Sequence, residues 1–254
     1  MKPISGRKLA KWILGAAILV LMPGILAAFL TQLSGFLGVT VHGPIPDPAS
    51  LLVQLRAFSR QLGFLLVVGG ALGVVFAYRA EDIPKIDTIS WYIHLVGHEL
   101  VHALLAKLCG YRIKEFKLTR HGGYVAYTKP NARGNFLISL GPYLFPLIPI
   151  LLTVIAALLR GTAQSIVVFL LGVSLGSHLI GTAQEALDQY DVQHVGRFFS
   201  VMLIVLVNLC LAVGVMAVVA PARVSFQSFL VHSWRATGWY LGGLARGLTG
   251  LLRG

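Results

Sequence analysis

Charged side chains are scarce in this chain, and acidic side chains are the scarcest of them. Only 12% of its 254 residues are charged, nine residues are acidic, and 56% are hydrophobic. In soluble domains about a quarter of the residues are charged, so this composition excludes an ordinary water-soluble domain. The mean hydropathy of +0.79 supports the same conclusion. We expect a membrane protein.

The few charges are unbalanced, with a formal net charge of +12. No basic run with interleaved aromatic residues is present, so a nucleic-acid partner is not expected. Basic residues at membrane edges and anionic lipid headgroups explain the charge better, and the lipid bilayer is the expected partner. Cysteine is equally rare: Cys109 and Cys210 form neither a disulfide framework nor a CxxC metal site.

Long apolar runs indicate an all-α polytopic membrane protein, since a helix needs roughly 20 mainly apolar residues to span a bilayer. About six transmembrane helices are predicted, at Trp12–Leu33, Leu62–Tyr78, Thr88–Leu108, Phe136–Leu159, Ser165–Ala183 and Phe198–Ala220. The first run is longer than a typical signal peptide and favours a retained span. We expect a multi-pass protein located in a bacterial cell membrane.

The stretch between the third and fourth runs differs from the rest. Glu115–Leu118 and Tyr124–Thr128 are short alternating segments bounded by glycine and proline turn signals, which predicts a β-hairpin-like structure. The chain then divides into an N-terminal membrane segment (1–87, about two spans), a central core (88–220) and a C-terminal interfacial tail (221–254).

The basic residues do not define one membrane orientation. Lys2, Arg7, Lys8 and Lys11 favour a cytoplasmic N-terminus, and the basic loop 107–134 also favours the cytoplasm. Three full spans between them would place them on opposite sides. Either one element before His98 is re-entrant, or the charge rule fails at one site.

Residues 97–108, GHELVHALLAKL, place polar groups in an apolar run. Burying such groups is costly unless they are paired or bound. His98 and His102 are four residues apart, so they share one helix face and can offer two imidazole nitrogens to one ion. Glu99 is then placed to act as a general base. The pattern is the H-E-x-x-H motif of zinc peptidases; the structural alternative is a polar cluster that joins helices by hydrogen bonds.

A catalytic zinc ion uses three protein ligands, so one more must come from elsewhere. Most other acids lie in loops before the motif or in the basic loop. The segment 181–199, which ends one span and precedes another, holds Glu185, Asp188 and Asp191. The residues alone leave the choice among these three open.

Other histidines are weighed as neighbours of the site. His94 lies four residues before His98 and so shares its helix face, where it is either an outer partner of the metal site or a packing residue. His178 lies inside an apolar run, as an interior histidine or one that reaches the site. His194 is an alternative ligand.

Four motifs resemble a known family. His98–His102 in an apolar run, GGYVAY (122–127), SLGPYLFPL (139–147) and YDVQHVGRFFS (190–200) are similar to site-2-protease-type intramembrane zinc metallopeptidases, the M50 family, and to its M50B-like branch in particular. The resemblance covers roughly residues 90–215. No accessory PDZ or CBS domain fits in the chain.

The resemblance implies a zinc cofactor with defined ligands. The two zinc histidines of the family fall on His98 and His102, the catalytic glutamate on Glu99, and the third ligand on Asp191. Asp188 is the second choice for that ligand, because Leu187-Asp188-Gln189 stands where a better-known branch has Leu-Asp-Gly. The Gly-Pro element of the family matches Gly141-Pro142.

Three functions follow from these patterns. The first is an intramembrane zinc metalloendopeptidase that cleaves membrane-anchored protein substrates. The second is a non-proteolytic zinc-binding regulatory or assembly factor on the same scaffold. The third, a transporter with an ion path, is disfavoured because the chain lacks duplicated halves.

Overall fold

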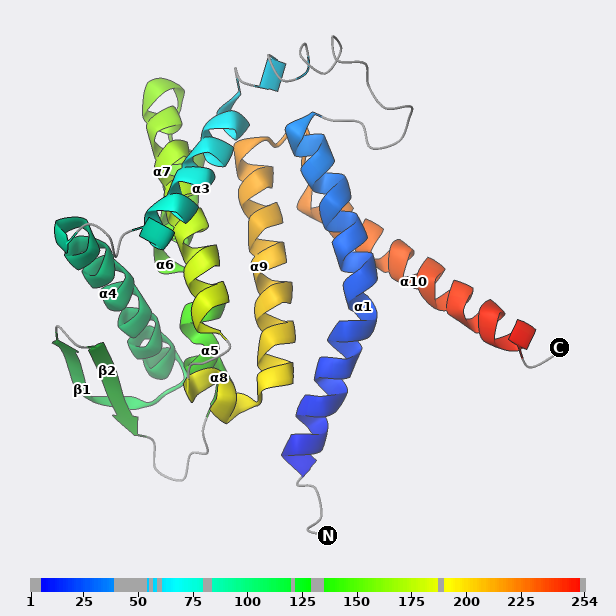
Figure 1. Ribbon diagram of the computed structural model, residues 1–254, viewed down its shortest axis with the longest axis horizontal. Helices are drawn as coiled ribbons and strands as arrows, with labels where there is room; N and C mark the ends of the chain where they lie inside the picture. The colour runs from blue at the N-terminus through cyan, green and yellow to red at the C-terminus, as the bar shows by residue number, and fades with distance from the viewer. Residues whose placement is uncertain are drawn as a thin grey trace. The chain divides into compact units, whose positions relative to one another are not determined.

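The computed structural model describes residues 6–38, 54, 57–58, 61–79, 84–119, 122–128, 135–186 and 190–251. This part of the chain is mostly helical and contains one two-stranded sheet (Figure 1). The chain forms two compact units. One unit is residues 65–204, and the other combines residues 1–64 with residues 205–254.

The unit of residues 65–204 contains most of the elements. In chain order they are α3 (Leu62–Arg79), α4 (Pro84–Leu108), β1 (Arg112–Thr119), β2 (Gly122–Thr128), α5 (Phe136–Leu144), α6 (Leu147–Leu158), α7 (Gly161–Glu185), α8 (Tyr190–Val195) and the start of α9 (Arg197–Val219). Its core is apolar, and Ile138, Leu140, Val168, Leu171 and Val192 are fully buried.

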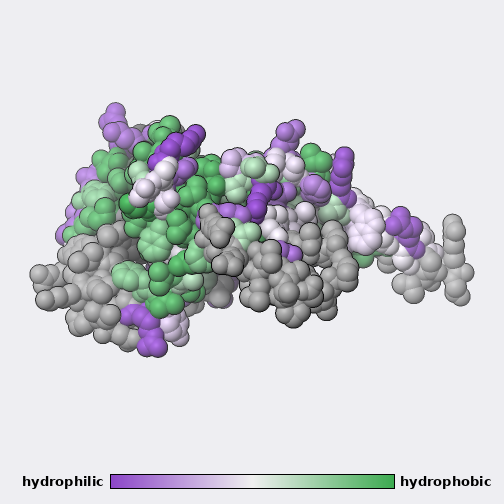
Figure 2. Space-filling view, turned by 90° about the horizontal axis from the view of Figure 1, so that it is seen from above, coloured by the Kyte–Doolittle hydropathy of each residue, from purple (hydrophilic) through white to green (hydrophobic). Residues whose placement is uncertain are grey.

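Several helices are long and apolar enough to cross a membrane. In the described residues they are Leu9–Leu37 within α1 (Gly6–Leu37), α3, α7 and α9, and the bent pair α5 and α6 adds a fifth if it forms one broken span. This pair bends by 56° at its break, where Pro146 precedes α6. Large apolar side chains such as Val75 and Ile166 are exposed on these helices. In the view of Figure 2, hydrophobic residues (green) gather over the left part of the visible surface.

One of the six predicted spans, the third in chain order, is not confirmed. Thr88–Leu108 is helical and lies within α4, but α4 is not among the helices apolar enough to span a membrane. The physical reason is its content of three histidines and a glutamate, which lower its hydropathy. The spanning role of α4 therefore stays a prediction, and the helix carries a polar stripe within an apolar sequence.

The predicted hairpin is confirmed. Strands β1 and β2 pair antiparallel from Arg112 opposite Thr128 to Thr119 opposite Gly122, with an irregularity between Ile113 and Glu115. Both strands pack against α4 (Figure 1). The sheet therefore continues the chain directly from the end of the helix that carries the H-E-x-x-H motif.

Glycines allow helices α3 and α7 to approach closely. A Cβ atom on Gly73 would collide with the backbone of Val173, and one on Gly176 would collide with the backbone of Gly70. The Ser177 hydroxyl donates a hydrogen bond to the Gly73 carbonyl at 3.0 Å. Small residues at a crossing let backbones meet, which is how helices associate where lipid removes the hydrophobic driving force.

The other unit is built on helices α1 and α10 (Phe226–Leu251), which pack together. Gly24 of α1 contacts Ser233 and Thr237 of α10, and the Gln32 side chain accepts a hydrogen bond from the Ser225 backbone. The glycine-rich tail is thus a long helix, and its place at a membrane surface stays a prediction.

Replacing Gly73 or Gly176 by leucine is expected to lower the melting temperature in detergent, because overpacking a close contact costs about 1–3 kcal/mol. Gly214→Leu on α9 is the matched control, since a Cβ atom there meets nothing within 4 Å. Thermal unfolding of the purified variants measures the difference. Equal melting temperatures for Gly73→Leu and Gly214→Leu would contradict the close approach.

Candidate metal centre

Helix α4 presents the whole H-E-x-x-H motif from one turn. The imidazole rings of His98 and His102 have centroids 4.9 Å apart and an interplanar angle of 65°. Glu99 and His102 are buried, with 7% and 8% of their surface exposed, and His98 is half-buried. The predicted spacing thus puts both imidazoles on one face, with the carboxylate beside them.

A backbone oxygen of helix α5 orients the His102 side chain. The Nδ1 atom of His102 lies 2.8 Å from the backbone oxygen of Ile138. A carbonyl oxygen can only accept, so Nδ1 carries a proton, and in the neutral imidazole Nε2 then keeps its lone pair. Gly141 makes this approach possible, because a Cβ atom there would collide with Leu105 of α4. The ring of Tyr143 meets the ring of His98 edge-on, with centroids 5.5 Å apart.

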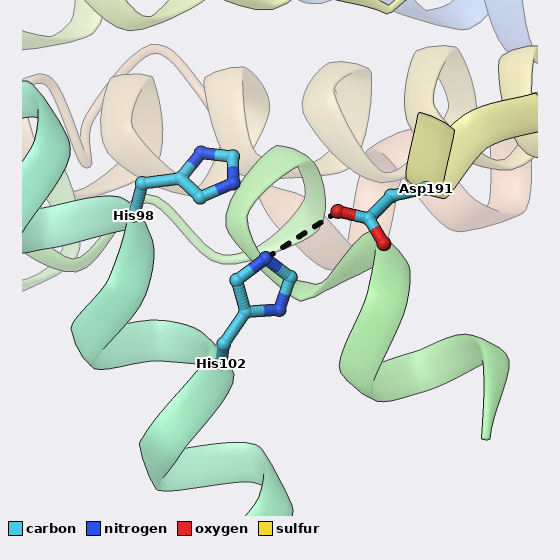
Figure 3. Close-up of side chains that lie close together, drawn as sticks. All are labelled: His98, His102 and Asp191. Carbon is cyan, nitrogen blue, oxygen red and sulfur yellow. Dashed lines mark ion pairs between the residues drawn. The ribbon is translucent and has the colours of Figure 1, made fainter. Parts of the chain in front are cut away.

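The third group comes from helix α8, far along the chain. Asp191 lies in its first turn, and its Oδ2 atom is 3.7 Å from Nε2 of His102 (Figure 3). Val192 and Val195 of the same short helix are buried, and the Ser200 hydroxyl donates to the Val192 carbonyl at 3.3 Å. Packing of α8 therefore fixes where the carboxylate points.

The three groups converge on one point. One ligand atom each from His98, His102 and Asp191 lies within 4.8 Å of the others. Ligand atoms about 2.0–2.2 Å from one zinc ion lie on the order of 3–4 Å apart, a spacing reached by small side-chain rotations. Two imidazoles and one carboxylate are also a donor set of catalytic zinc sites. The residues fit a zinc ion.

The electrostatics near Asp191 favour a neighbouring positive charge. Burial raises the pKa of Asp191, and the nearby His102 only partly opposes this shift. Burial also raises the pKa of Tyr127 on β2, and the negative charge of Asp191 raises it further. Because burial disfavours the ionised carboxylate, a cation placed beside it offsets the desolvation cost.

Strand β2 lies over Glu99. A Cβ atom on Gly123 would lie 2.7 Å from Cγ of Glu99 and 3.0 Å from a methyl carbon of Leu118. Only a residue without a side chain fits between the strand and this glutamate. The Gly122-Gly123 pair predicts a turn in the sequence, but no sequence pattern indicates its contact with Glu99.

Of the other two candidate acids, Glu185 does not join this group of described residues. Glu185 is the last residue of α7 and is half-buried. Asp188 lies outside the described residues, so the choice between Asp188 and Asp191 rests on the position of Asp191 alone.

Two of the remaining histidines make other contacts in the described part of the chain. His178 contacts the Thr182 hydroxyl at 3.4 Å, and His194 stacks on Tyr190 with ring centroids 5.4 Å apart. The side chain of His94 lies outside the described residues. Sequence reasoning missed Ile138 and Tyr143, although the Gly141-Pro142 element between them was a usable signal.

A group of two histidines and one aspartate that could hold a metal ion, in a chain with several helices long and apolar enough to cross a membrane, is compatible with a membrane metallopeptidase. The chain belongs to the family described as Peptidase M50B-like, whose sequence model matches residues 68–249. The match covers α4, the hairpin, α5 and α8, and it confirms the M50 resemblance. No curated protein and no solved structure matches the chain.

Proposed function

We propose that this chain is a zinc-dependent endopeptidase that hydrolyses peptide bonds of membrane-anchored protein substrates. The observation that carries the proposal is the convergence of His98, His102 and Asp191 within 4.8 Å of one another. Membership of the M50B-like family supports the same reaction class. Zn²⁺ is the proposed cofactor, and these three residues are its proposed ligands.

Each residue has a defined chemical task in this proposal. A bound zinc ion supplies Lewis-acid polarisation of the peptide carbonyl and lowers the pKa of water. Glu99 is the general base: its carboxylate takes a proton from the attacking water and delivers a proton to the leaving amide nitrogen. The burial of Glu99 under β2 excludes bulk solvent from this carboxylate and fixes its direction.

The surroundings suit a substrate that arrives from the membrane. Polar side chains and strands are tolerated near lipid only where they face a protein-enclosed cavity. On the face of α4 that bears the histidines, the motif is contacted by α5, α8 and β2. We therefore place hydrolysis at membrane depth, in a space enclosed by these elements.

Metal analysis tests the ligand set. Wild-type protein is expected to hold about one zinc ion per chain, and His98→Ala or Asp191→Asn is expected to lose most of it, because three ligands are needed. Asp188→Asn is the matched control and should retain the ion. Loss of zinc in Asp188→Asn with retention in Asp191→Asn would reverse the assignment of the third ligand.

Glu99→Gln separates the peptidase from a zinc protein without proteolytic activity. Glutamine keeps the shape of the side chain but cannot accept the proton, so cleavage is expected to fall at least about 100-fold, with zinc content unchanged. A membrane-anchored reporter peptide, analysed by gel shift and mass spectrometry, measures it. Retained cleavage rejects Glu99 as the base, and zinc binding without any wild-type cleavage favours the non-proteolytic function.

Gly123→Ala tests the contact between β2 and Glu99. The added methyl group must displace the glutamate or the strand, so we expect cleavage to fall at least tenfold while zinc content stays unchanged, since a misplacement of about 1 Å is costly in catalysis. Gly238→Ala on α10, where a Cβ atom meets nothing within 4 Å, is the control. Wild-type activity in Gly123→Ala would show that β2 does not position the base.

A further inference from the structure

The proline inside helix α5 stands at a position with a specific consequence for the metal centre. Pro142 follows Ile138 by four residues within this nine-residue helix. In a regular α-helix the N–H of residue 142 would donate to the carbonyl of residue 138. Proline has no N–H, so the Ile138 carbonyl receives no such bond.

This carbonyl lies where water cannot readily replace the missing donor. Ile138 is fully buried, and Pro142 is buried as well. A buried carbonyl without a partner is costly, so it needs a donor from the protein. His102 supplies that donor through Nδ1, at 2.8 Å.

Because the Ile138 carbonyl needs a hydrogen-bond donor, it fixes the tautomer of the His102 imidazole. With Nδ1–H committed to Ile138, the lone pair of Nε2 faces Asp191, 3.7 Å away. A histidine that binds a metal commonly donates its other N–H to a carbonyl or carboxylate, which fixes the tautomer and the ring orientation. The proline thus acts on the proposed metal site through a backbone group.

We infer that Pro142 is a positioning residue for His102: by removing a helix hydrogen bond it reserves the Ile138 carbonyl for Nδ1 of this histidine. The inference rests on the zinc site proposed above. This role differs from that of a packing residue. Pro142 weakens its own helix, yet it orders a ligand of the metal site.

Pro142→Ala tests this inference through two effects of opposite sign. Alanine restores an N–H that competes with His102 for the Ile138 carbonyl. The metal-free variant should melt at the same temperature as wild type or higher, since proline disfavours a helix interior. Its zinc affinity, measured by competition with a chelating dye, should fall about tenfold, as losses of outer partners of metal ligands do.

Pro23→Ala is the matched control, because Pro23 also lies inside a long helix, α1, but in the other unit. It should raise or preserve the melting temperature and leave zinc affinity unchanged. Unchanged zinc affinity in Pro142→Ala overturns the inference. An equal loss of affinity in Pro23→Ala also overturns it, because the effect would then be a general response to helix repair.

A measurement on the wild-type protein does not depend on the folding of any variant. Nitrogen-15 NMR of zinc-loaded protein with labelled histidine should show one imidazole bound through Nε2 with a proton on Nδ1, and that signal should be absent in His102→Ala. Binding of His102 through Nδ1 overturns the inference. If the wild-type protein holds no zinc at all, the proposed metal site fails instead.

Discussion

The need to satisfy polar groups on an otherwise apolar helix governs the arrangement around α4. Glu99 and His102 are buried, as are the apolar Val101, Ala103 and Ala106 of the same helix, and unpaired polar groups are costly in such surroundings. Three neighbouring elements contact these groups. Helix α5 places a backbone oxygen beside one nitrogen of His102, and α8 places a carboxylate near the other. Strand β2 packs against Glu99. The site is thus defined by what surrounds one turn of helix.

Close backbone contact recurs wherever elements meet. Gly73 and Gly176 join α3 to α7, Gly24 joins α1 to α10, and Gly141 joins α5 to α4. Because lipid removes much of the hydrophobic gain from helix association, packing at short range has to supply the cohesion. The same device that holds helices together therefore also brings the Ile138 carbonyl to His102.

The sequence predicted those features that depend on local spacing. The four-residue interval of His98 and His102 gives the ring pair, and the alternation in 115–128 gives the hairpin. Asp191 was reached by resemblance, and only the packing of α8 brings it near the imidazoles. The contacts of Ile138 and Gly123 arise between segments distant in sequence, which periodicity does not encode. The helix α10 forms despite its glycines because it packs on α1, and tertiary contact overrides weak propensity.

The late position of Asp191 in the chain has a consequence for biosynthesis. His98 and His102 emerge from the ribosome well before the segment that bears the carboxylate, and the hairpin, α5, α6 and α7 lie between them. A nascent chain therefore carries two imidazoles without their acidic companion, and two ligands hold a metal ion less firmly than three. Under the proposed function, the complete ligand set would therefore exist only once α8 has been made.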